Sequence, residues 1–130
     1  IMEKQIIDVP RKKPEGRPET PLSLAVKAGD FVFVSGQPPT DFATGEFVHG
    51  DIETQTRQCL ENVKTVLEAA GSSMKKVVKV QVLCANAAHF QRVNAIYRQY
   101  FTEDFPARSF ITVGSWPGGF DIEIECIAIA

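Results

Sequence analysis

The chain has 130 residues, of which 44% are hydrophobic and 23% are charged, and its net charge at pH 7 is −2. This length predicts a single domain over residues 1–130 with one hydrophobic core. The weakly acidic charge argues against nucleic acid as a partner, because surfaces that bind nucleic acid are usually basic. No apolar run approaches the roughly 18 residues that a membrane helix needs, so a membrane partner is not expected either.

Two strands are predicted near the N-terminus, followed by a strongly apolar third. Turn-forming Pro and Gly residues separate them. Alternating and β-branched residues indicate strands over 4–9, 22–27 and 31–34, with a loop over 10–21. The segment 35–39, Ser-Gly-Gln-Pro-Pro, is expected to end the third strand, because proline cannot continue a central ladder.

The middle of the chain predicts helix, strand and helix. An apolar stripe of helical period runs over 51–70, with Asp51 as N-cap and Gly71 at the C-terminal end. A strand rich in β-branched residues follows over 77–84. Asn86 is expected to cap a second helix that extends to about residue 101.

The last quarter predicts a strand pair over 107–114 and 120–130, joined by a glycine-rich turn. Arg108 lies in the first strand of this pair. Asp121, Glu123 and Glu125 alternate along the second, so they should share one face. We expect the cation to face these carboxylates across a hairpin, either as a structural ion pair or as the site of a small charged substrate.

These elements predict an α+β fold in which two helices pack on one face of a mixed β-sheet. The opposite face would remain apolar, because five large side chains can point toward it: Phe33, Ile111, Val113, Ile127 and Ile129. Exposed apolar surface of this extent predicts burial against another subunit, and therefore an obligate oligomer.

No motif indicates a metal or a cofactor. Cys59, Cys84 and Cys126 are odd in number and widely spaced, which is unlike a zinc site. The chain has no P-loop and no dinucleotide-binding fingerprint. The N-terminus lacks the pattern of a signal peptide. Unpaired thiols together with this N-terminus predict a cytoplasmic protein.

Arg108 and Glu123 are the strongest candidates for chemistry. A guanidinium matches a carboxylate in geometry and charge, so Arg108 could bind a small acid or could pair with Glu123 or Glu125. Glu123 could order or deprotonate a water molecule, or serve only in such a pair.

Three further residues could contribute to a site, and each has a structural alternative. Gly36 would allow a ligand close to the backbone. The Ser35 hydroxyl could bind a carboxylate or make a turn hydrogen bond, and Asn94 could bind a ligand, bind a neighbouring segment or lie exposed.

The chain resembles the reactive intermediate deaminase family, also called RidA or YjgF. The resemblance extends from about Leu22 to the C-terminus. It is carried by FVSGQ (33–37), TGE (44–46), QTRQCLENV (55–63), LEAAG (67–71), VNAIY (93–97) and YF (100–101), and above all by FPARS (105–109) and IEIE (122–125).

This resemblance implies a chorismate-mutase-like fold and a homotrimer whose sheets line a central barrel, with active sites between subunits. It implies hydrolysis of 2-aminoacrylate-type enamines and imines to a 2-oxo acid and ammonia, as in 2-iminobutanoate/2-iminopropanoate deaminases, without metal or cofactor. Arg108 would bind the substrate carboxylate and Glu123 would position the water. Ser35 and Asn94 would occupy the cleft, and the backbone at Gly36 and Phe110 would line it.

Two positions depart from the family pattern. Leu22 stands where such deaminases often have tyrosine, and Phe110 stands where they often have cysteine. Both changes make the predicted pocket more apolar, so a preference for larger or more apolar imines is expected.

Two other functions remain open. A non-catalytic module that senses small carboxylates such as 2-oxo acids would need Arg108 but not Glu123. An endoribonuclease or translation inhibitor, a role attributed to some relatives, fits poorly with the acidic charge and with the lack of a basic patch containing aromatic residues.

Overall fold

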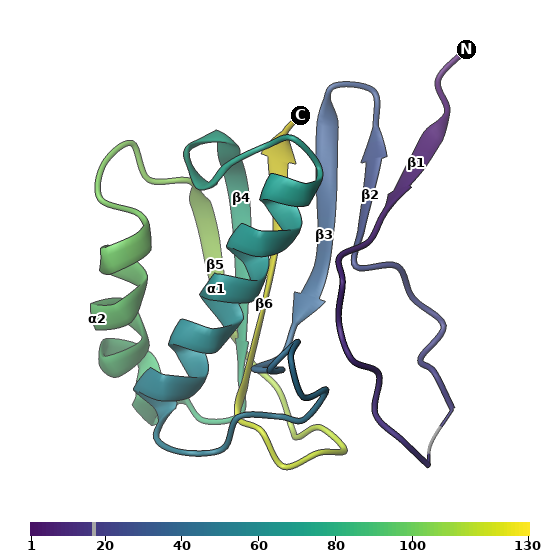
Figure 1. Ribbon diagram of the computed structural model, residues 1–130. Coiled ribbons are helices and arrows are strands. Elements are labelled where there is room, and N and C mark those ends of the chain that lie inside the picture. The colour runs from purple at the N-terminus through teal and green to yellow at the C-terminus, as the bar shows by residue number, and fades with distance from the viewer. Residues whose placement is uncertain (17) are drawn as a thin grey trace.

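A computed structural model of the protein describes residues 1–16 and 18–130. These residues form one six-stranded sheet with the strand order β1-β2-β3-β6-β4-β5, and two α-helices lie against one of its faces (Figure 1). Among the described strands only β4 and β5 run parallel. The predicted α+β class, with a mixed sheet and two helices on one face, is therefore confirmed. The strands are β1 (Lys4–Ile7), β2 (Ala25–Ala28), β3 (Phe31–Gln37), β4 (Val77–Cys84), β5 (Ala107–Thr112) and β6 (Ile122–Ile129).

The helices begin and end close to the predicted positions. In α1 (Ile52–Ala69) the Asp51 carboxylate accepts a hydrogen bond of 2.8 Å from the Thr54 amide, as an N-cap does. Gly71 follows that helix with a φ of 80°, a conformation that favours glycine. Asn86 caps the short 3-10 turn Ala87–His89, and α2 (Phe90–Tyr100) continues from it. A second 3-10 turn covers Met74–Lys76.

The core lies between the sheet and α1. Alternate side chains of β3, β4 and β6 point toward the helices and are buried, because successive residues of a strand face opposite sides. They meet the apolar stripe of α1, where Leu60, Val63 and Leu67 are almost fully buried. Among the described residues, no helix combines the length and hydrophobicity needed to span a membrane.

The predicted pairing of the last two strands is wrong. β4 lies between β5 and β6, with Val80 opposite Arg108 on one side and opposite Cys126 on the other. The reason is topological: α2 connects β4 to β5, so β5 returns parallel to β4 and takes the edge of the sheet. Arg108 therefore does not face the carboxylates of β6 across a hairpin.

The predicted row of three carboxylates contains two. Glu123 and Glu125 alternate with buried residues of β6 and point away from the helices. Asp121 precedes the strand and exchanges two hydrogen bonds with Gln55 of α1. Its side chain thus ties the start of β6 to the helix layer.

β3 is longer than predicted. It continues beyond Val34 through a bulge in which Ser35 and Gly36 occupy the space opposite a single residue of β6. The two prolines that follow, Pro38 and Pro39, end the strand, as expected. The predicted loop over 10–21 has no helix or strand in its described part, and residue 17 lies outside the described residues.

The sheet face without helices carries exposed apolar residues on the neighbouring strands β3 and β6, as predicted. Phe31 and Phe33 of β3 are 44% and 45% exposed, and they lie opposite Ile129 and Ile127 of β6. Ile6 of β1, 53% exposed, continues the row. We call this set of five residues the apolar sheet face. Ile111 is also exposed on this side, at the β5 edge, whereas Val113 lies beyond the end of that strand.

Candidate active site

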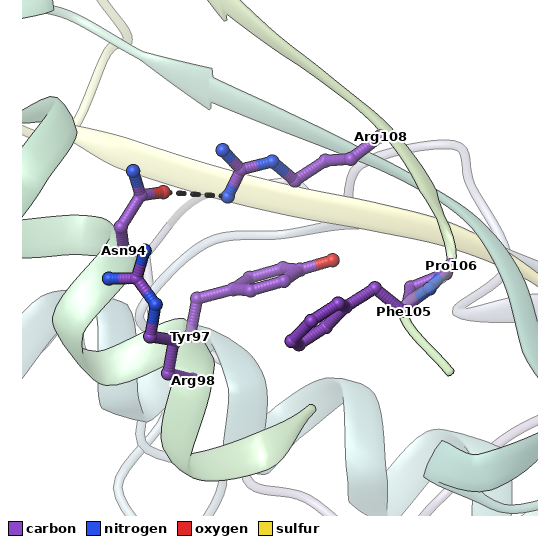
Figure 2. Close-up of a pocket in the computed structure, with 6 residues that line it drawn as sticks. All are labelled: Asn94, Tyr97, Arg98, Phe105, Pro106 and Arg108. Atoms are coloured by element: carbon purple, nitrogen blue, oxygen red, sulfur yellow. Dashed lines mark hydrogen bonds between the residues drawn. The ribbon is translucent and has the colours of Figure 1, made fainter. Parts of the chain in front are cut away.

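Arg108 extends from β5 toward α2 and is held there by three side chains. One guanidinium nitrogen donates a 2.8 Å hydrogen bond to the side-chain oxygen of Asn94, as Figure 2 shows. The guanidinium carbon lies 4.8 Å from the centre of the Tyr97 ring and 5.7 Å from that of Phe90. Cation–π contacts of this kind fix the orientation of the cation without neutralising its charge.

Arg108 forms no ion pair within the described part of the chain, where the ion pairs found are Asp8–Arg11, Lys13–Glu19 and Glu53–Arg92. The alternative in which Arg108 pairs with Glu123 or Glu125 is therefore wrong. Asn94 is 8% exposed and binds a neighbouring segment, so the alternative of simple exposure is also wrong. A partly buried guanidinium that lacks an acidic partner is suited to receive an anion.

A cavity of about 230 Å³ opens beside this guanidinium. It is lined by Asn94, Tyr97, Arg98, Phe105, Pro106 and Arg108, which come from α2 and from the start of β5 (Figure 2). Sites for drug-sized ligands are larger, roughly 300–1,000 Å³. The cavity thus matches a small acid in both size and charge.

A larger groove of about 380 Å³ follows the outer side of α1, and it is a weaker candidate. Its lining includes the carboxylates of Asp51, Glu53 and Glu61, and Glu53 is engaged by Arg92 at 2.6 Å. None of the predicted site residues lines this groove. Volume alone therefore does not identify the candidate site. The smaller cavity is the stronger candidate because the Arg108 guanidinium beside it can bind an anion.

Glu123 lies on the opposite face of the sheet from Arg108. Its carboxylate sits against Gly36, where an added Cβ would overlap it. The bulge in β3 and the absence of a side chain at Gly36 together make room for this carboxylate. The two predicted catalytic residues are therefore not brought together within one chain.

Half-burial raises the pKa of the Glu123 carboxyl above its usual value, because the charged form loses solvation. The neighbouring Glu125 raises the pKa further by repulsion, and a hydrogen bond from Trp116 acts in the opposite direction. A carboxylate with a raised pKa is a stronger base, and this suits a residue that accepts a proton from water.

The remaining predicted residues divide between these two regions. Ser35 donates a 2.6 Å hydrogen bond to the backbone carbonyl of Ser23, so its hydroxyl has a structural partner in a neighbouring segment and does not make the turn hydrogen bond named as the alternative. Phe110 packs edge-to-face on Phe90 with ring centres 5.1 Å apart. Leu22 is more than half exposed, and neither Leu22 nor Phe110 lines the cavity at Arg108.

We call Asn94, Tyr97 and Arg108 the arginine half-site, and Ser35, Gly36 and Glu123 the glutamate half-site. The sequence interpretation did not single out Tyr97 as a site residue. The available signal was spacing: Tyr97 follows Asn94 by three residues, so the two share one side of the helix.

The cysteines offer no alternative nucleophile. All three are buried and unpaired, and burial raises the pKa of each thiol, to about 12 for Cys126. A thiol with such a pKa is protonated and unreactive at neutral pH. No cluster of three metal-ligating side chains occurs among the residues that the structure describes.

Comparison with known proteins defines the class. Residues 12–130 match the family described as Endoribonuclease L-PSP. A RutC family protein of Pyrococcus horikoshii is 49% identical over 112 residues, which cover 86% of this chain and 89% of that protein. The human 2-iminobutanoate/2-iminopropanoate deaminase is 41% identical over 109 residues, which cover 84% of this chain and 80% of that protein. The crystal structure of E. coli TdcF with bound serine has a TM-score of 0.86 at 34% identity, with 97% of this chain and 98% of that chain covered.

These matches define the class of protein: a small α+β protein with the same fold as the solved structures of its relatives. The chain belongs to the Endoribonuclease L-PSP family, which includes the proteins called RutC, YjgF and RidA. The resemblance found in the sequence is confirmed.

Gly36→Ala tests how the glutamate half-site is packed. The new methyl group would overlap the Glu123 carboxylate, so we expect the free energy of unfolding to fall by about 1–3 kcal/mol in urea denaturation. Gly114→Ala is the matched control, because a Cβ there meets no atom within 4 Å. Equal stability of the two variants would contradict this packing.

Glu123→Gln tests the raised pKa. A carboxyl whose pKa is higher in the folded than in the unfolded state destabilises the folded protein once the pH exceeds the unfolded value, about 4.3. The amide removes this cost. We therefore expect Tm to rise by about 1–2 °C at pH 7 and the gain to disappear near pH 4.

Glu68→Gln, on the exposed side of α1, serves as the control for the loss of one negative charge. A gain in Tm that is the same for both variants, or that persists unchanged at pH 4, would argue against a raised pKa at Glu123.

Proposed function

We propose that this protein is a hydrolytic deaminase of reactive 2-imino and 2-enamino acids, which it converts to 2-oxo acids and ammonia. The observation that carries the proposal is the Arg108 guanidinium, held by Asn94 beside a small cavity and lacking an acidic partner. Two relatives support it: the human one is named for this activity, and the E. coli one was crystallised with serine, itself a small acid with a carboxylate.

The hydrolysis needs a group that holds the substrate in position and a base that accepts a proton from water. The enamine is protonated at its β-carbon to give the imine, whose C2 is already electrophilic. Arg108 holds the carboxylate, a water molecule adds to C2, and Glu123 takes the proton from that water. Glu123 then gives this proton to the nitrogen of the carbinolamine and the C–N bond breaks to release ammonia. The hydroxyl oxygen forms the C=O bond of the 2-oxo acid as its proton returns to the solvent, which supplied the proton for the β-carbon. No cofactor takes part, because no step needs an electron sink or a redox partner.

We propose that each active site combines the arginine half-site of one protomer with the glutamate half-site of another, in a homotrimer. Within one chain the sheet separates Arg108 from Glu123, so a shared site needs a second chain. The apolar sheet face gives protomers a reason to associate, because large exposed apolar patches are rare on monomers. Its position on the same face as Glu123 would bring that carboxylate into the interface.

Leu22 and Phe110 are proposed to act on specificity from this interface. Leu22 is exposed in the single chain, and Phe110 lies on the edge strand β5. Both are apolar where related deaminases often have tyrosine and cysteine. The enzyme should therefore favour imines with larger apolar side chains over 2-aminoacrylate.

The first test measures turnover. Amino-acid oxidases generate imines of different size in situ, and the decay of the imine and release of ammonia are followed with wild type, Arg108→Ala and Glu123→Ala. We expect each variant to lose about a hundredfold or more in kcat/KM, because each loses a positioning or proton-accepting group. The panel also reports the preference for larger side chains, and equal rates on small and bulky imines would contradict it.

The same variants separate the deaminase from its rivals. A sensor of 2-oxo acids would show no turnover and would bind its ligand equally well with Glu123→Ala. An endoribonuclease would cleave RNA whatever residue occupies position 108. Wild-type protein that accelerates no imine in the panel would overturn the proposal.

The second test asks whether two protomers share a site. Arg108→Ala and Glu123→Ala are co-expressed with different tags, and mixed oligomers are isolated by tandem purification. Each mixed trimer then contains one site of three that combines an intact Arg108 with an intact Glu123, so activity should return to about a third of the wild-type value.

A mixture of Arg108→Ala with the double variant Arg108→Ala/Glu123→Ala is the control, because it contains no intact Arg108. Light scattering gives the mass of each sample. A site built within one chain would leave the first mixture as inactive as this control, and a monomeric mass would exclude the shared site altogether.

A further inference from the structure

The Tyr97 hydroxyl is buried without a hydrogen-bond partner. Tyr97 is 6% exposed, and its oxygen contacts no donor or acceptor among the described residues. The ring itself is well packed: its centre lies 4.7 Å from that of the Phe101 ring and 4.8 Å from the guanidinium carbon of Arg108. The ring thus has a clear structural role, whereas the hydroxyl bonds to no other group in the described part of the chain.

A buried polar group without a partner costs free energy, so a phenylalanine would serve the core better at this position. Tyrosine hydroxyls in protein interiors usually find a partner. The location indicates what that partner is, because Tyr97 lines the cavity beside the Arg108 guanidinium, which pairs with no acid among the described residues. Figure 2 shows the hydroxyl directed along the cavity toward the start of β5.

The hydroxyl is available as a donor. Burial raises the pKa of Tyr97 to about 12, with the nearby Arg108 acting in the opposite direction, so the phenol keeps its proton at neutral pH. Phe105, on the side of the ring opposite Arg108 in Figure 2, is 63% exposed and has little packing to hold it. Phe105 and Tyr97 both line the cavity, so a ligand bound there lies next to both side chains.

We propose that the Tyr97 hydroxyl is the second hydrogen-bond donor to the carboxylate of the small acid that Arg108 binds. This inference rests on the proposed function and adds a ligand-binding residue to it. Arg108 supplies the charge, and the phenol fixes the orientation of the carboxylate in the plane next to the ring. Because one guanidinium nitrogen of Arg108 already donates to Asn94, a second donor helps to define that orientation.

The test compares Tyr97→Phe with wild type in calorimetric titrations with 2-oxobutanoate, a stable 2-oxo acid of the product class. We expect affinity to fall about tenfold, since one hydrogen bond to a charged group is lost. The Tm of the ligand-free variant should stay the same or rise, because no partner inside the protein loses a bond. A merely structural hydroxyl would instead lower Tm and leave the affinity unchanged.

Tyr100→Phe is the matched control. Tyr100 lies one turn further along α2 and does not line the cavity, and its hydroxyl interacts with Glu61 and Arg57 of α1. Its replacement should leave 2-oxobutanoate binding unchanged. Arg108→Ala provides the reference for loss of the charge.

The outcomes separate the two proposals. If Arg108→Ala abolishes binding but Tyr97→Phe binds like wild type, the role of Tyr97 is overturned while the deaminase proposal stands. If wild type itself binds no 2-oxo acid, both fail. A Tm of Tyr97→Phe more than about 3 °C below that of wild type, or an altered oligomeric mass, would assign the hydroxyl to protein contacts and overturn the inference.

Discussion

The proposed chemistry depends on the Arg108 guanidinium, which pairs with no acid among the described residues. The Arg108 guanidinium rests on the ring of Tyr97 and is tied to the amide of Asn94, and neither contact cancels its charge. Proteins usually neutralise a partly buried charge with an acid, and this chain has acids on the next strand but one. The sheet keeps them on the other face, so the charge remains available to a ligand.

The position of Glu123 on the other face of the sheet also determines the surroundings of its carboxylate. Glu123 lies on the face that carries the exposed Phe31 and Phe33, and it is pressed against the bare backbone of Gly36. Burial of the carboxylate raises its pKa, which makes Glu123 a stronger base. The same burial lowers the free energy of unfolding at neutral pH, where the carboxylate is charged. A group kept at a cost to the fold is more readily explained by chemistry than by packing.

Local patterns in the sequence located most elements to within a few residues. The helix over 51–70 follows from its apolar stripe and from the caps Asp51 and Gly71, and β4 follows from its β-branched run. The failures were of another kind. Placing β5 next to β6, and counting Asp121 with Glu123 and Glu125, both assumed that neighbours along the chain are neighbours in the sheet.

The sequence by itself determined the class of fold, the family and the candidate residues Arg108, Asn94 and Glu123, because periodicity, capping and short motifs are local properties of the chain. Only the tertiary structure decided which of them meet. It brought Asn94 into hydrogen-bond contact with Arg108 and placed Glu123 on the opposite face of the sheet. It also showed that the buried Tyr97 hydroxyl has no hydrogen-bond partner among the described residues. The physical reason is that strand order depends on how helices and crossovers pack over long sequence distances, and no local pattern encodes that order.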